Sequence, residues 1–151
     1  MFSLLRGGFL GNGNAAPVFI IHCVNNSGAA LAQGDVVVLD RSNSTVNAIY
    51  VTTSTGGNDI DVVGMVYDAT LPSLGIGRVQ IWGPTKYLKV DGTTDIAVGD
   101  MLGTYTTAKI AQKSTTAGRF ARAMEAYTTN DSLGVIDAFI LNMNLGAFTT
   151  E

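Results

Sequence analysis

Short hydrophobic runs recur along the chain between clusters of glycine, asparagine and serine. In GRVQIWG, for example, Val79 and Ile81 are separated by positions that suit an exposed face. A period of two is typical of β-strands, because successive side chains point to opposite faces of a sheet. The pattern predicts strands at residues 17–25, 35–40, 45–53, 61–69, 77–83, 86–90, 100–105, 108–113, 119–127 and 134–143.

The segment 119–127 is compatible with two structures. Phe120, Met124 and Tyr127 are spaced as on one face of a two-turn helix, so a helix remains an alternative to the strand. We favour the strand.

Many short strands with turn residues between them are typical of all-β barrels and sandwiches. We therefore predict an all-β chain that folds as a small β-barrel or β-tulip-like domain of about ten short strands. Residues 1–16 are interpreted as an extended N-terminal arm and hinge, and residues 17–151 as a single β-barrel-like domain. The apolar patch at the start is interrupted by Arg6 and two glycines, and it is interpreted as part of the arm, not as a signal peptide.

One phrase occurs twice, as LAQGDVVVLD at 31–40 and as IAVGDMLGTY at 96–105. In each copy a Gly-Asp turn leads into a strand, and the segments 62–69 and 120–127 follow in matching places. This order is compatible with a weak internal duplication whose two halves close one barrel. Coincidence is the alternative, since Gly-Asp turns are common in all-β chains.

The chain is poor in charge: 14% of its residues are charged, 46% are hydrophobic and the mean hydropathy is +0.27. Soluble domains usually contain about 25% charged residues. The apolar runs are much shorter than the roughly 20 residues that span a bilayer, so no membrane association is predicted. We instead expect copies of the chain, or a partner, to cover much of the surface.

Charge and reactive groups exclude several functions. The net charge is −3 without a basic cluster, which argues against nucleic-acid binding. The single Cys23 is predicted to lie in the core, and the single His22 in the core or on a sheet face. Asp59 and Asp61 are expected to form a turn in preference to a calcium loop. GNGNAA at 11–16 matches a loose dinucleotide pattern, but it precedes a strand and is interpreted as a linker.

We therefore predict no catalytic residues, no cofactor and no metal site. An enzymatic alternative is dUTP pyrophosphatase, because GVID at 134–137 is similar to that family's substrate motif. The similarity ends at once, and Leu141 stands where the motif requires an arginine to balance phosphate charge.

The order GDVVVLD, VVGMVYDA, GRVQIWGP, IAVGDMLGTY, ARAMEAY, GVIDAFILN resembles the head decoration, or capsid cement, proteins of tailed bacteriophages, over about residues 29–141. The resemblance implies a homotrimer that is assembled in the host cytoplasm. It would bind the outer capsid surface of the virion and clamp subunits of the major capsid protein. Similar modules in tail fibres and spikes leave a fibre-associated or receptor-binding module as the alternative.

Contact residues follow from this implied role. Trp82 and Tyr87 flank a Gly-Pro turn and are interpreted as subunit-interface anchors, or as a cap on the barrel core. Arg122, like Arg78 and Arg119, is an isolated cation that could pair across a subunit boundary or remain solvated. The arm contains the predicted capsid contacts, which could alternatively form a first strand of the barrel: Phe2, Leu4, Leu5, Phe9 and Leu10.

Overall fold

The computed structural model describes residues 16–57, 59–116 and 118–141. The regular structure in these ranges is entirely β, as the sequence pattern predicts. The eleven strands are β1 (Phe19–Asn25), β2 (Leu31–Ala32), β3 (Val36–Leu39), β4 (Tyr50–Thr52), β5 (Val62–Val66), β6 (Thr70–Leu71), β7 (Ile76–Val90), β8 (Met101–Thr104), β9 (Ala111–Lys113), β10 (Arg119–Ala123) and β11 (Gly134–Ile140).

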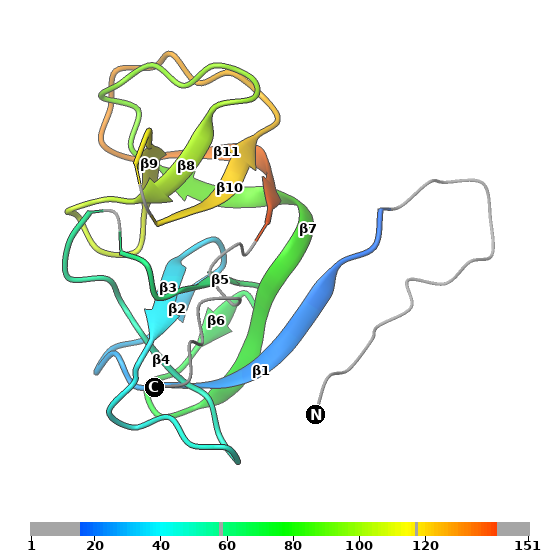
Figure 1. Ribbon diagram of the computed structural model, residues 1–151, viewed down its shortest axis with the longest axis vertical. Helices are drawn as coiled ribbons and strands as arrows, with labels where there is room; N and C mark the ends of the chain where they lie inside the picture. The colour runs from blue at the N-terminus through cyan, green and yellow to red at the C-terminus, as the bar shows by residue number, and fades with distance from the viewer. Residues whose placement is uncertain (1–15, 58, 117, 142–151) are drawn as a thin grey trace.

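Nine of these strands form two closed hydrogen-bonded circuits that share the long strand β7 (Figure 1), and β2 and β6 pair separately with each other. The N-terminal barrel has the order β1-β4-β3-β5-β7 and is closed by the pairing of β1 with β7. The C-terminal barrel has the order β7-β11-β10-β8-β9 and is closed by the pairing of β7 with β9. In Figure 1, β7 runs as one green ribbon from the lower group of strands to the upper group.

The small β-barrel fold is confirmed, but the way in which the two halves close differs from the expectation. Instead of jointly closing one barrel, each half closes its own circuit of five strands. This is possible because β7, with 15 residues, is long enough to contribute one end to each circuit.

The two halves repeat one pairing scheme. In each barrel the strand after the Gly-Asp turn pairs with the next two strands of its half. Each circuit also contains one parallel pair, β1 with β4 or β7 with β9. The register also repeats, with an irregularity at the same step of the ladder. The pairs Val36↔Met65, Val37↔Gly64 and Val38↔Val62 correspond to Met101↔Arg122, Leu102↔Ala121 and Gly103↔Arg119.

Even the strand ends correspond. The last residue of β1 is the buried Asn25, whose Oδ1 accepts the Ser27 N–H at 2.9 Å. The buried Asp91, directly after β7, likewise accepts the Thr93 N–H at 2.9 Å. A duplication explains these matches better than coincidence does, because they involve pairing partners as well as residue types.

Two apolar clusters form the core. One fills the N-terminal barrel with residues such as Ile21, Cys23, Val37 and Val79. The other fills the C-terminal barrel and also includes outward-facing residues of the N-terminal barrel. These outward-facing residues are Val36 and Val38 on β3 and Val62 and Met65 on β5. The C-terminal barrel therefore packs on the outer face of β3 and β5, and buries it.

The largest local difference from the predicted strands lies at Gly83-Pro84. Instead of separating strands at 77–83 and 86–90, this pair lies inside β7. Gly83 has a φ of +103°, and the side-chain amide of the buried Gln80 donates to the carbonyls of Gly83 at 2.9 Å and Pro84 at 3.0 Å. These bonds satisfy backbone groups where the chain bends, so the strand continues.

Other boundaries shift modestly. Segment 119–127 is not a helix: β10 ends at Ala123, and Tyr127 forms an isolated bridge to Ile96. The strands predicted at 45–53 and 108–113 shorten to β4 and β9, because turns occupy their first residues. The short β2 and β6 were not predicted. None of the described residues form a helix that is long and apolar enough to cross a membrane.

Candidate interaction surface

The duplicated Gly-Asp phrase forms the same turn twice. In the first copy, Asp35 donates its N–H to the Ala32 carbonyl at 3.0 Å, and its Oδ2 accepts the Ala32 N–H at 2.9 Å. In the second copy, Asp100 makes the same two bonds with Ala97, at 3.1 and 2.8 Å. Gly34 and Gly99 have φ angles of +85° and +90°, which glycine adopts without steric cost.

The hydrogen bonds also fix how the segments after β5 and β10 correspond. The N–H of Gly34 donates to the Val66 carbonyl at 3.0 Å, and that of Gly99 to the Ala123 carbonyl at 2.9 Å. Val66 is therefore equivalent to Ala123. Aligning the segments 62–69 and 120–127 end to end would instead match Met65 with Ala123, so the true alignment is shifted by one residue. The sequence predicted that the two segments correspond, but it did not predict their residue-by-residue alignment.

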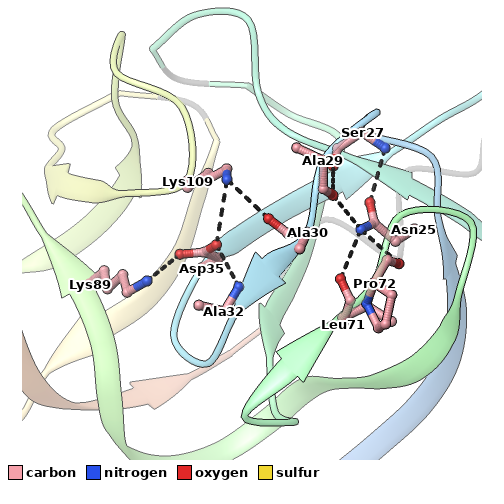
Figure 2. A network of polar contacts seen from close by, with 10 residues as sticks. All are labelled: Asn25, Ser27, Ala29, Ala30, Ala32, Asp35, Leu71, Pro72, Lys89 and Lys109. Carbon is pink, nitrogen blue, oxygen red and sulfur yellow. Dashed lines mark hydrogen bonds and ion pairs between the residues drawn. The ribbon is translucent and has the colours of Figure 1, made fainter.

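The surroundings of the two turns differ. Asp35 is buried, and its carboxylate lies 2.5 Å from Lys89 Nζ and 4.0 Å from Lys109 Nζ (Figure 2). Both lysines belong to the C-terminal barrel, so this ion pair joins the barrels. The neighbouring backbone agrees, since the Val36 N–H donates to the Lys109 carbonyl at 2.8 Å.

Asp100 instead pairs with Lys113 of its own barrel, at 2.8 Å from Nζ. The hydrogen bond from Lys113, together with that from the Ala97 N–H, lowers the pKa of the Asp100 carboxyl below its ordinary value of 3.8. A lowered pKa in the folded state favours folding above that ordinary value, and the contribution is lost as the pH falls below it.

The surroundings of Gly34 and Gly99 differ in the same way as those of the two aspartates. A Cβ added at Gly34 would lie 1.8 Å from the Tyr87 carbonyl oxygen, because the C-terminal half of β7 crosses directly over this turn. A Cβ added at Gly99 would meet no described atom within 4 Å. The first turn is therefore covered, and the second is open.

The strand faces beside the two turns also differ in exposure. Val62 and Met65 on β5 are 2% and 0% exposed beneath the C-terminal barrel. Their equivalents on β10 are Arg119 and Arg122, and both are exposed. The duplicated fold thus buries this face in one barrel and leaves it open, with two cations, in the other.

Most described cations have a partner. Arg41 pairs with Asp61 and Arg78 with Asp68, and the three lysines named above are paired too. Arg119 and Arg122 form no ion pair with another residue of the described ranges. Arg122 is exposed on β10, and whether it pairs across a subunit boundary or remains solvated stays a prediction.

The two aromatic residues predicted as anchors have separate environments. Trp82 is half-buried and packs edge-on against Phe19 and Phe139, with ring centroids 5.4 and 4.8 Å apart, where β1, β7 and β11 meet. Tyr87 is 49% exposed and lines an open depression with Met124 and Asp137. Neither arrangement tests the interface role.

The predicted arm contacts Phe2, Leu4, Leu5, Phe9 and Leu10 lie outside the described residues. Their role therefore stays a prediction.

The cysteine, histidine and turn aspartates singled out in the sequence have separate environments in the described part of the chain. Cys23 is buried in the N-terminal barrel, and desolvation raises the pKa of its thiol to about 12, so the thiol stays protonated at neutral pH. His22 is exposed on β1, opposite Arg78. Asp59 accepts the Asp61 N–H at 2.9 Å, which is the predicted turn. Within the described ranges, no three acidic, histidine or cysteine side chains gather as a metal site would require.

Sequence reasoning singled out Arg122 but missed what distinguishes it. The signal is present in the repeat: apolar Val62 and Met65 in the first half are replaced by arginines in the second. It becomes readable only when the register is known.

Comparisons with known proteins extend this picture at the level of the fold. No protein-family model matches the chain. No curated protein matches it either. Among solved structures, the chain is similar to the N base of the head fiber protein gp8.5 of bacteriophage phi29, with a TM-score of 0.53 and 14% sequence identity. The match covers 82% of this chain and 95% of that chain. The likeness establishes a shared fold.

Proposed function

We propose that this chain is a structural subunit of a bacteriophage head. In the specific role that we favour, it binds the outer capsid surface as a homotrimeric decoration protein and holds neighbouring major capsid protein subunits together. The observation that carries the proposal is the fold shared with the base of a phage head fiber. The order of motifs that resembles head decoration proteins supports the same assignment independently.

The physical character of the surface supports an assembly role. Only 14% of the residues are charged, and several large apolar side chains are exposed, including Leu74, Ile76 and Val135. Such a surface favours association with protein. Three copies that dock together multiply weak individual contacts through effective concentration, so no single patch needs to be strongly adhesive.

A second candidate function is a fibre-associated module. The name of the similar structure favours it, since that protein is the base of a head fiber. In this role the chain would anchor an appendage to the head and would not need to bridge capsid subunits.

Binding to undecorated phage heads tests the proposal and separates the two roles. A decoration protein is expected to sediment with such heads and to raise their melting temperature, because it binds only the assembled shell. Binding without thermal stabilisation would favour the fibre-associated role. Failure to sediment with heads would contradict both.

Deletion of residues 1–12 tests the predicted clamp. If the five apolar arm residues contact the shell, the deletion is expected to weaken sedimentation with heads and to leave the barrel folded by circular dichroism. Replacement of Phe2, Leu4 and Leu5 by serine, which keeps the chain length, provides a matched variant. An unfolded deletion product would mean that the arm forms part of the barrel core.

A further inference from the structure

The open turn of the C-terminal barrel lies in a ladder whose order the hydrogen bonds define. Arg119 pairs with Gly103 and Arg122 with Met101, after which Gly99 bonds to Ala123 and Ile96 to Tyr127. The two arginines therefore lie toward one end of the ladder, and the Ile96–Tyr127 bridge lies at the other.

Exposed carboxylates lie near that second end. Asp95 precedes Ile96, and Glu125 lies two residues before Tyr127. Both side chains belong to exposed residues and form no ion pair with any other described residue, whereas the other described carboxylates are at least partly buried. Unpaired cations and unpaired anions thus flank the same turn.

Apolar side chains lie between the two sets of charges. Val98 and Met124 flank the Gly99–Ala123 hydrogen bond and are 66% and 52% exposed. When such surfaces face a common threefold axis, the cationic side of one copy meets the anionic side of the next, and the apolar centres meet at the axis.

In the N-terminal barrel, the surface equivalent to this one is covered by protein. There the equivalent turn and strand face are covered by another barrel. Lys89 and Lys109 pair with Asp35 (Figure 2). Val62 and Met65 belong to the apolar cluster that fills the C-terminal barrel. The same backbone surface therefore already forms one barrel-to-barrel interface within the chain.

From these observations, the geometry points to the surface formed by Asp95, Val98, Arg119, Arg122, Met124 and Glu125 as the face through which copies of this chain associate. We call it the Gly99 surface. The inference deepens the proposed function, because it names the contact between subunits of the proposed homotrimer. Around a threefold axis, the arginines of one copy meet Asp95 and Glu125 of the next, while Val98 and Met124 of all copies meet near the axis.

The alternatives on the molecule fit less well. The depression beside Tyr87 is open and nothing in it identifies an occupant, and the Trp82 cluster is satisfied by its own neighbours. Within the described ranges, only the Gly99 surface combines complementary unpaired charges with a structural precedent in the same chain.

Charge reversal tests the inference in solution. Arg119→Glu/Arg122→Glu is expected to weaken self-association at least about tenfold in sedimentation velocity and light scattering, because like charges then face each other. Asp95→Lys/Glu125→Lys is expected to do the same. The combined fourfold variant restores opposite charges and is expected to associate within about threefold of the unaltered protein.

The matched control is Arg41→Glu. Arg41 is an exposed cation of the N-terminal barrel whose surface ion pair with Asp61 contributes little stability, and its reversal is expected to leave association unchanged. Circular dichroism and the melting temperature of each variant separate loss of association from loss of fold. Unchanged association of the Arg119/Arg122 variant, equal loss in the Arg41 variant, or no recovery in the fourfold variant would each overturn the inference.

The same measurements keep the two proposals apart. An unaltered protein that stays monomeric at all concentrations but sediments with heads would overturn the Gly99 surface alone. A trimer that the arginine reversal dissociates, but that never binds heads, would overturn the proposed function and leave the interface standing.

Discussion

At the scale of single residues, the carboxylates of Asp35 and Asp100 accept the same backbone hydrogen bond within equivalent turns. Their second interactions differ, since Asp35 receives lysines from the other barrel and Asp100 receives Lys113 from its own. The sequence predicts the turn at both positions, because Gly-Asp is a local signal. It cannot predict which aspartate becomes buried, because burial depends on residues more than 50 positions away.

Neutralising these aspartates separates the two environments. Asp35→Asn is expected to lower the free energy of unfolding by about 3 kcal/mol, because it leaves Lys89 partly buried without its counter-ion. Asp100→Asn removes a more exposed pair and is expected to cost less than about 1 kcal/mol. Urea unfolding at neutral pH measures both, and equal losses would contradict the different burial of the two turns.

At the scale of elements, the alternating pattern located most strands correctly, because a half-buried strand records its two faces in its own sequence. The pattern failed at Gly83-Pro84, where both residues normally end a strand. The bonds that keep β7 continuous come from the side chain of Gln80, and nothing in the local pattern distinguishes that glutamine from an exposed one. The alternative helix at 119–127 failed for a related reason, since Phe120 is buried by sheet neighbours instead of a helical stripe.

The two glycine turns provide a matched test of how the elements pack. Gly34→Ala is expected to destabilise the fold by more than about 3 kcal/mol, because the added methyl group collides with the backbone of β7. Gly99→Ala meets open space and is expected to cost only about 1 kcal/mol, from its positive φ. Thermal and urea unfolding of both variants measure the difference, and similar losses would show that the strain of the turn outweighs the collision.

At the scale of the whole molecule, the sequence indicated an all-β barrel, a possible duplication and a surface suited to assembly. It did not indicate two barrels, because the halves share a strand and a strand count cannot reveal that one element serves twice. The open face of the second barrel was likewise hidden until the register aligned Val62 with Arg119 and Met65 with Arg122.

The shared core predicts how the molecule unfolds. Val36, Val38, Val62 and Met65 of the N-terminal barrel belong to the cluster that fills the C-terminal barrel, so neither barrel can lose its packing alone. A single calorimetric transition is therefore expected, with equal calorimetric and van't Hoff enthalpies for each cooperative unit. Two separated transitions would show that the barrels are energetically independent.

The strand common to both barrels also limits how the chain can be divided. A protease that cut within β7 would disrupt a strand that both circuits need. Cleavage after Val90 would separate β8 to β11 from β7, the strand that closes their circuit. Within the described part of the chain, cleavage between the two barrels therefore cannot yield two intact barrels, although the halves repeat each other.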